Sequence, residues 1–222
     1  MSFRVSLRRR KGQRGSELVE FALYGVLMIP VLTWTFVNGF NELRANQCQQ
    51  INIQIANQYI HGVDYSTYAA QQVAVRLAQG YQLSVNSFSG NQADNTSSSG
   101  QVYFMLSQVM YIGTGACGTQ SPCNNKNKYV YLQQITFGNP SITFNGTQVS
   151  SKLGSLTATR TSGGYVTNIL TDAGAVCANC ANFFQTQLTD GQVAYVVEGF
   201  FADPALGVAA YPSGGIYTQT FM

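Results

Sequence analysis

The sequence predicts an α+β fold in which a long N-terminal membrane-spanning helix also packs against an antiparallel β-sheet head with a second, short helix. Three observations predict this fold. The run from Leu18 to Phe40 holds 23 residues with Glu20 as its only formal charge. An amphipathic helical pattern follows it, and the second half of the chain contains several apolar runs of strand length. The 222 residues suffice for one anchored domain with a sizeable core.

The apolar run is long enough to cross the roughly 30 Å hydrocarbon core of a membrane as a helix. Half of the 12 Lys and Arg residues precede it, which predicts a cytoplasmic N-terminus and an exported remainder. A secretory signal peptide is an alternative, but no good small-residue cleavage site follows the run. A plain signal anchor would explain the length and the charge. It would not explain a Gly15-Ser16 junction before the run with Glu20 inside it.

The segment around this junction, Gly15-Ser16-Glu17-Leu18-Val19-Glu20-Phe21, resembles the class III signal of type IV pilin-like proteins. Its continuation, Ala-Leu with a proline soon after, is most similar to the TadE-like pseudopilins, or minor pilins, of the tight-adherence (Flp) pilus system. The resemblance implies that a prepilin peptidase cuts after Gly15. Ser16 then becomes the first mature residue and Glu20 the fifth, where the family carries its glutamate. A cut after Gly12 would leave Arg14 at the head of the membrane segment.

The resemblance also implies a domain organisation. Residues 1–15 would be a cytoplasmic leader, 16–60 the N-terminal helix with a membrane span of about 18–40, and 61–222 an exported α+β head. Glu20 and Phe21 would act in assembly, with other pilin subunits and inner-membrane lipid around the helix. The expected location is the bacterial inner membrane, single pass, and after assembly an extracellular pilus. The expected function is structural and not enzymatic. Two alternatives stay open: the main subunit of a filament, and a membrane-anchored adhesin or binding module.

After the membrane run the helix is expected to continue, with Cys48, Ile51, Ile55 and Tyr59 on one face. Gly25, Pro30 and Asn38-Gly39 are the expected kinks or breaks, and His61-Gly62 is the expected end. A second helix should begin at Asp64 or Ser66 and end at Gln79. Its small-residue face would comprise Ala69, Ala70, Val73, Ala74 and Leu77. Residues 84–100 are expected to form a polar loop.

Four runs predict strands: Val102 to Ile112, Tyr129 to Phe137, Gln192 to Ala202 and Gly215 to Met222. The short loops favour antiparallel pairing of the first two and of the last two. In the second run, alternation would place Tyr129, Tyr131, Ile135 and Phe137 on one face. Residues 138–175 are the least defined, with one short strand expected near Leu156 to Thr161. Parts of the first, third and last strands also look like the ectodomain of TadE-like proteins, although less specifically.

Five cysteines should tend to oxidise outside the cytoplasm, and two bridges among them allow fifteen arrangements. We favour local pairing of Cys117 with Cys123 and of Cys177 with Cys180, with Cys48 as a small buried hydrophobe. Two other interpretations stay open. Cys177-Ala-Asn-Cys180 could be a redox pair, but no βαβ pattern precedes it. The four cysteines could bind zinc, although the first pair is widely spaced for that.

Charged residues make up only 9% of the chain, which is typical of weakly charged exported proteins. The net charge of +3 is misleading, because loss of residues 1–15 would leave six basic against nine acidic residues. No basic patch for nucleic acid remains. His61 is the only histidine, so it has no histidine partner for a metal site or proton relay. Glu198 could be a buried functional acid, but it is expected to face outward from its strand. No cofactor or metal site and no catalytic residues are predicted.

Overall fold

The computed structural model describes residues 13–81, 83, 100–144, 146–184, 188–202 and 215–222, with the backbone alone at 13–17. Most of the predicted leader and most of the predicted polar loop at 84–100 lie outside these residues. The chain divides into two units, Met1–Glu42 and Leu43–Met222. The first contains the N-terminal part of a long helix, and the second contains the rest of that helix and the head.

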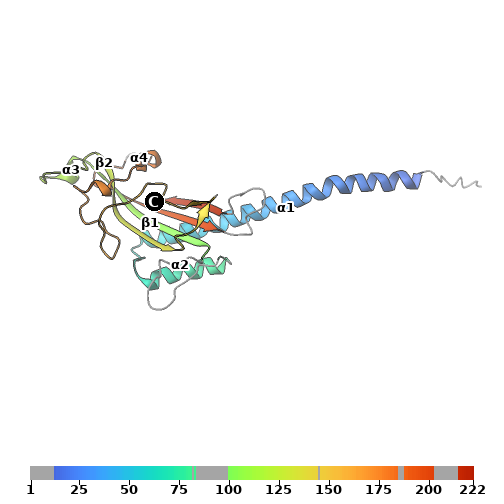
Figure 1. The fold of residues 1–222 in the computed structure, drawn as a ribbon, viewed down its shortest axis with the longest axis horizontal. Coiled ribbons are helices and arrows are strands. Elements are labelled where there is room, and N and C mark those ends of the chain that lie inside the picture. The colour runs from blue at the N-terminus through green and yellow to red at the C-terminus, as the bar shows by residue number, and fades with distance from the viewer. Residues whose placement is uncertain (1–12, 82, 84–99, 145, 185–187, 203–214) are drawn as a thin grey trace, which may run out of the picture. The chain divides into compact units, whose positions relative to one another are not determined.

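The fold is α+β, as the sequence predicts (Figure 1). Helix α1 comprises Gln13–Ile60 and helix α2 comprises Tyr68–Gly80. The main sheet has four antiparallel strands in the order β2-β1-β5-β6. Its strands are β1 Val102–Ile112, β2 Lys128–Gly138, β5 Val193–Ala202 and β6 Gly215–Phe221. The short elements are α3 Thr114–Cys117, β3 Thr143–Phe144, β4 Thr147–Gln148, the 3₁₀ turn η1 Ala173–Ala175 and α4 Cys180–Phe183.

Helix α1 continues through every expected break and ends where the sequence predicts. Pro30 lies inside the helix, so one absent backbone donor in 48 residues does not end it. At the C-terminus Gly62 has a φ of 84°, a conformation that glycine adopts without strain. The Val63 N–H donates to the Gln58 carbonyl at 3.0 Å, and the Gly62 N–H to that of Tyr59 at 3.1 Å. These two bonds form a Schellman motif.

The second half of α1 and helix α2 share one hydrophobic core with the sheet. The predicted α1 face is confirmed, because Cys48, Ile51, Ile55 and Tyr59 are all buried. On the sheet this cluster contains apolar side chains from all four strands: Val102, Phe104, Leu106, Ile135, Phe137, Val197, Phe201 and Ile216. Burial of one such large apolar side chain contributes about 1.5–3 kcal/mol. The two helices therefore cover the same face of the sheet.

The predicted packing face of α2 is rotated from the real one. Ala70, Ala74 and Ala78 are buried in an i, i+4, i+8 row, whereas Ala69 and Val73 are exposed. Polar bonding fixes this rotation, because the buried Gln71 side chain donates Nε2–H to the Tyr65 carbonyl at 2.8 Å. The helix begins at Tyr68, after the expected caps. Asp64 instead closes the preceding turn by accepting the Ser66 N–H at 2.9 Å.

The sheet confirms the predicted antiparallel pairing of β1 with β2 and of β5 with β6, and it also pairs β1 with β5. The register shifts between β1 and β2: Gln108 lies opposite Gln133, but Val109 lies opposite Tyr131. The extra residue, Leu132, reverses the side-chain alternation of β2. The four residues predicted to share a face are therefore divided, because Ile135 and Phe137 face the helices while Tyr129 and Tyr131 belong to a second cluster.

This second cluster lies on the other face of the sheet, under the irregular segment between β2 and β5. The strand predicted near Leu156 to Thr161 is absent, since only an isolated bridge from Arg160 to Val166 forms there. Residues 164–177 also run along the outer edge of β2. The Val166 N–H donates to the Leu132 carbonyl at 2.9 Å, and the Cys177 N–H to that of Tyr129 at 2.9 Å. Backbone bonds to an irregular segment thus satisfy part of the edge of β2.

Candidate functional site

The N-terminal part of α1 exposes many large apolar side chains, and contact of such side chains with water is unfavourable. Exposed fractions reach 72% at Leu18, 79% at Phe21 and 66% at Phe36. Contiguous apolar surface of this extent marks a site for membrane or protein contact. In the described part of the chain this is the one helix long and apolar enough to cross a membrane, with a mean hydropathy of 1.6 in its apolar window.

Polar side chains inside this apolar segment bond to their own helix. Thr33 Oγ1 donates to the Ile29 carbonyl at 2.8 Å, and Asn38 Nδ2 donates to the Trp34 carbonyl at 2.8 Å. Such bonds to the preceding turn satisfy donors that hydrocarbon cannot. The segment therefore tolerates these residues without polar partners on another chain.

The candidate processing and assembly residues lie at the start of α1. Gly15 and Ser16 have helical backbone in the first turn, and nothing about their side chains is described. Glu20 follows Ser16 by four residues, which is about one helical turn. Both Glu20 and Phe21 are exposed. Their assigned roles in processing and assembly stay predictions.

A polar contact fixes the second half of α1 against the sheet. Asn52 is fully buried, and its Nδ2 donates to the Val197 carbonyl at 2.9 Å and to Thr220 Oγ1 at 3.1 Å. Gly199 leaves room for this side chain, because a Cβ there would lie 3.0 Å from Asn52 Oδ1 and 2.7 Å from the Phe201 ring. A polar residue inside a Gln- and Asn-rich helical stretch gives no sequence signal for such a contact.

Tyr59, the penultimate residue of α1, makes a second polar contact. Its hydroxyl donates to Gln133 Oε1 at 2.8 Å, and Gln108 Nε2 donates to the same oxygen at 2.9 Å. Burial raises the pKa of Tyr59 far above its ordinary value. The hydroxyl therefore stays a neutral donor at physiological pH, and α1 is held to both β1 and β2.

Glu198 is a buried carboxylate, so the prediction that it faces outward is wrong. Its carboxylate accepts Ser151 Oγ–H at 2.5 Å, the Lys152 N–H at 2.7 Å and Tyr217 O–H at 2.9 Å. Desolvation raises the pKa of Glu198, although these three bonds oppose that effect. The strand pattern could not reveal this site, because two of the donors come from an irregular segment 46 and 47 residues earlier.

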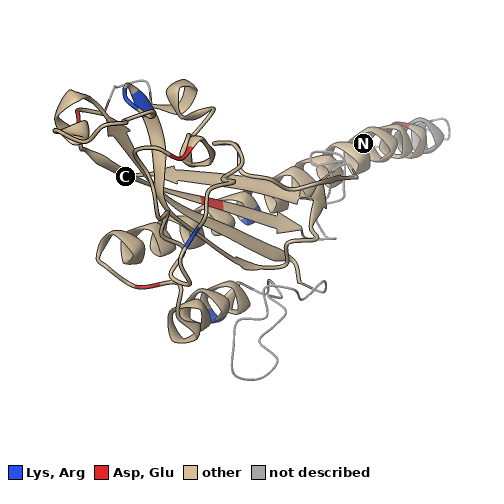
Figure 2. Cartoon of the chain, turned by 60° about the vertical axis from the view of Figure 1, so that its left-hand side comes forward, with Lys and Arg blue, Asp and Glu red and all other residues tan. Residues whose placement is uncertain are grey.

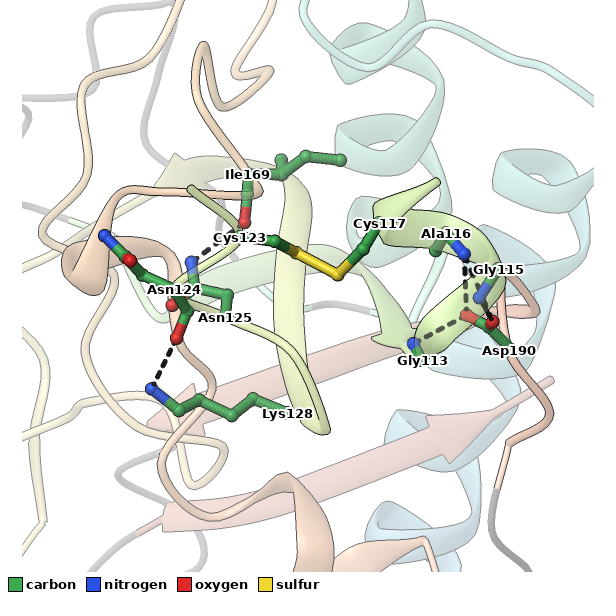
Figure 3. Close-up of a disulfide and its surroundings, with 10 residues drawn as sticks. All are labelled: Gly113, Gly115, Ala116, Cys117, Cys123, Asn124, Asn125, Lys128, Ile169 and Asp190. Carbon is green, nitrogen blue, oxygen red and sulfur yellow. Dashed lines mark hydrogen bonds between the residues drawn. A yellow bond between two sulfur atoms is a disulfide. The ribbon is translucent and has the colours of Figure 1, made fainter. Parts of the chain in front are cut away.

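Asp190 organises the connection between β1 and β2 (Figure 3). Its carboxylate accepts N–H bonds from Gly113 at 2.6 Å, from Ala116 at 3.1 Å and from Gly115. Desolvation opposes the charge, but the three backbone bonds together outweigh it and lower the pKa of Asp190. At Gly113 and Gly115 a Cβ would collide with this carboxylate. Asp190 thus fixes α3.

The candidate cysteines pair locally in the structure. Cys117 and Cys123 form a disulfide with Cα atoms 6.0 Å apart, here called the loop disulfide (Figure 3). Cys177 and Cys180 form the second, with Cα atoms 5.5 Å apart, here called the CANC disulfide. Cys48 belongs to neither and is buried. Whether both bridges form in the native protein stays a prediction.

The CANC disulfide is poorly placed for redox exchange. Cys180 is the first residue of the short helix α4, but Cys177 is 4% exposed and Cys180 is fully buried. A catalytic cysteine needs an accessible sulfur for attack by a substrate thiolate. The sulfurs of this pair are buried in the structure and not accessible to such an attack. Within the described residues, no three His, Cys, Asp or Glu side chains gather as a metal ion would require.

Charge is sparse and scattered over the described part of the chain (Figure 2). Comparison with models of protein families, with curated proteins and with solved structures gives no match.

Proposed function

We propose that this chain is a TadE-like pseudopilin, a minor subunit packed by its N-terminal helix into or beneath a Tad/Flp-type pilus. The observation that carries the proposal is the division of α1. Its apolar part exposes almost every side chain between Leu18 and Phe40, whereas one face of its second part is buried in the core of the head. A helix of this kind suits a chain with a membrane segment followed by an exported domain.

In the proposed mechanism the basic leader stays in the cytoplasm and a prepilin peptidase cuts after Gly15. The head is exported and the helix remains in the inner membrane. Cleavage creates an ammonium group on Ser16, one helical turn before Glu20. A lone carboxylate in hydrocarbon is costly, so Glu20 requires a cationic partner. We assign that partner to the Ser16 ammonium of a neighbouring subunit, which would fix the axial register of the two helices.

Two other partners for Glu20 compete with this assignment: the ammonium of the same chain, and lipid headgroups near the helix end. Neither requires a neighbouring subunit. Only the intermolecular contact makes filament assembly depend on the carboxylate, so a charge-removing variant separates the hypotheses.

The test is Glu20→Gln, which keeps the side-chain shape and removes the charge. We expect the variant to be cleaved and to accumulate in the membrane like the wild type, but not to join or support the pilus. Sheared-filament and membrane fractions from cells with the cognate assembly machinery would be compared by immunoblot. Glu42→Gln is the matched control, since Glu42 is another exposed carboxylate of α1, outside the apolar run. Normal assembly of Glu20→Gln would contradict the proposed contact.

Processing is tested separately by the intact mass of protein extracted from membranes. The expected mature chain begins at Ser16, and replacement of Gly15 by a bulky residue should leave the chain uncut. An uncleaved wild-type chain would favour a plain signal anchor. A chain cut after Phe40 would favour a secretory signal peptide, and either result would overturn the pseudopilin proposal.

A further inference from the structure

Two adjoining cavities lie beside β2, one of about 510 Å³ and one of about 270 Å³. They share three lining residues, Gln134, Thr136 and Arg160, and we call them together the Arg160 groove. The larger cavity is bounded by the start of α2, by β2 and by residues 158–164. The smaller one lies between β1, β2 and residues 149–156. The larger volume alone is in the range of small-molecule sites.

A tight hairpin forms one rim of the groove. The Thr161 N–H donates to the Tyr165 carbonyl at 2.8 Å, and the Gly164 N–H donates to the Thr161 carbonyl at 2.9 Å. Gly164 has a φ of 78°, and a Cβ there would lie 2.5 Å from the Gln134 carbonyl oxygen. Glycine is therefore needed for the hairpin to lie against β2, where the Gln134 N–H donates to the Gly164 carbonyl at 3.0 Å. The rim is bonded to the sheet.

Arg160 gives the groove one positive charge that is not neutralised by its walls. Its side chain is exposed, and its hydrogen bond to protein among the described residues is a long one of 3.4 Å to the Gln134 carbonyl. Neither set of lining residues contains Asp or Glu, and Arg160 is the only cation in both. A guanidinium with available donors binds carboxylates in bidentate geometry. One cation suits a singly charged carboxylate better than a phosphate, which carries more charge.

The remaining walls offer hydrogen-bonding groups on both sides of Arg160. Gln71 lines the larger cavity; it is 97% buried, and its Oε1 has no hydrogen-bond partner among the described residues. Thr161 and Ser162, which carry hydroxyl groups, also line that cavity. Tyr103 lines the smaller cavity and adds an aromatic ring. Hydroxyl and amide groups together with an aromatic ring match the hydroxyls and C–H faces of sugars.

We propose that the Arg160 groove binds a segment of an acidic polysaccharide, with the carboxylate of one uronate-type sugar on Arg160. The neighbouring sugars would occupy the two cavities on either side. The inference does not depend on the pilus assignment, because it concerns the head alone and holds for any exported form of the chain. It gives the head a ligand class: carboxylated glycans of a surface or matrix.

The test measures binding of trigalacturonate to the full-length protein in detergent by saturation-transfer NMR. Maltotriose serves as the neutral probe and inorganic phosphate as the competitor. We expect transfer to trigalacturonate and none to maltotriose. Arg160→Gln should weaken binding about tenfold or more, since a charge-assisted bidentate contact is lost. Arg76→Gln is the control, because Arg76 is an exposed arginine of α2 that lines neither cavity.

Arg160→Lys distinguishes a bidentate guanidinium–carboxylate contact from the effect of charge alone. We expect weaker binding than in the wild type, because the charge remains while the bidentate geometry is lost. Near-UV circular dichroism of each variant confirms that the head is folded. Equal binding of maltotriose, or equal losses in Arg76→Gln and Arg160→Gln, would overturn the proposal. Displacement by equimolar phosphate would also overturn it, because it would reveal a simple anion site.

Discussion

Gly199→Ala tests how closely α1 approaches the sheet. In the structure an added Cβ would lie 2.7 Å from the Phe201 ring, 2.9 Å from Thr218 Oγ1 and 3.0 Å from Asn52 Oδ1. These atoms belong to side chains that are themselves buried, so they have little room to move. Overpacking of a filled core costs about 1–3 kcal/mol, and loss of glycine entropy in the unfolded chain offsets about 0.4–1 kcal/mol. We expect a net destabilisation of about 1–2 kcal/mol.

For a head of this size, that loss corresponds to a fall in Tm of about 2–8 °C. Thermal unfolding of the full chain in detergent, followed by near-UV circular dichroism, reports the aromatic packing of the head. Gly80→Ala is the control, because nothing lies within 4 Å of a Cβ at Gly80. The double variant Asn52→Ala/Gly199→Ala should lose less than the sum of the single losses, since both changes act on one contact. An unchanged or higher Tm for Gly199→Ala would refute the close approach.

Two further predictions concern groups inside the head. The raised pKa of Glu198 means that the folded state binds its proton more tightly than the unfolded state, so the contribution of this group to stability is greatest below the ordinary value of 4.5 and is lost as the pH rises above it. Glu198→Gln should weaken that decrease between pH 5 and 8, as measured by denaturant midpoints, and an unchanged decrease would show that other groups cause it. Peptide mapping without reduction should find the loop and CANC disulfides in protein extracted from membranes, each stabilising by about 2 kcal/mol through loop closure; peptides cross-linked between the two loops would contradict local pairing.

Regular periodicity explains the parts of the fold that the sequence predicts well. The spacing of Cys48, Ile51, Ile55 and Tyr59 depends on helix geometry alone, and the structure buries all four. The four strands likewise coincide with stretches that are rich in apolar residues or alternate apolar with polar ones. Features that depend on a single residue cannot be predicted from such patterns. Leu132 shifts the register of β2 without any turn residue beside it, and one buried hydrogen bond from Gln71 rotates α2.

The candidate sites also differ in how far the sequence predicts them. Gly15, Ser16, Glu20 and Phe21 form a local motif, so the sequence alone supports a hypothesis about them. The Arg160 groove draws its walls from α2, two strands and two irregular segments, and no spacing along the chain joins these parts. The burial of Glu198 could not be predicted for the same reason. A carboxylate in a strand is buried only if donors from distant parts of the chain bond to it.

The irregular segment along β2 has a consequence for crowded membranes. An uncovered strand edge is a template on which another copy of the protein can add a strand. Here the N–H groups of Val166 and Cys177 donate to Leu132 and Tyr129, and Gly164 accepts from Gln134, so part of that template is occupied from within the chain. Copies of the protein concentrated in a membrane would therefore be hindered from joining into continuous sheets at this edge. Lateral association would be left to contacts that can be made and broken, such as those between helices.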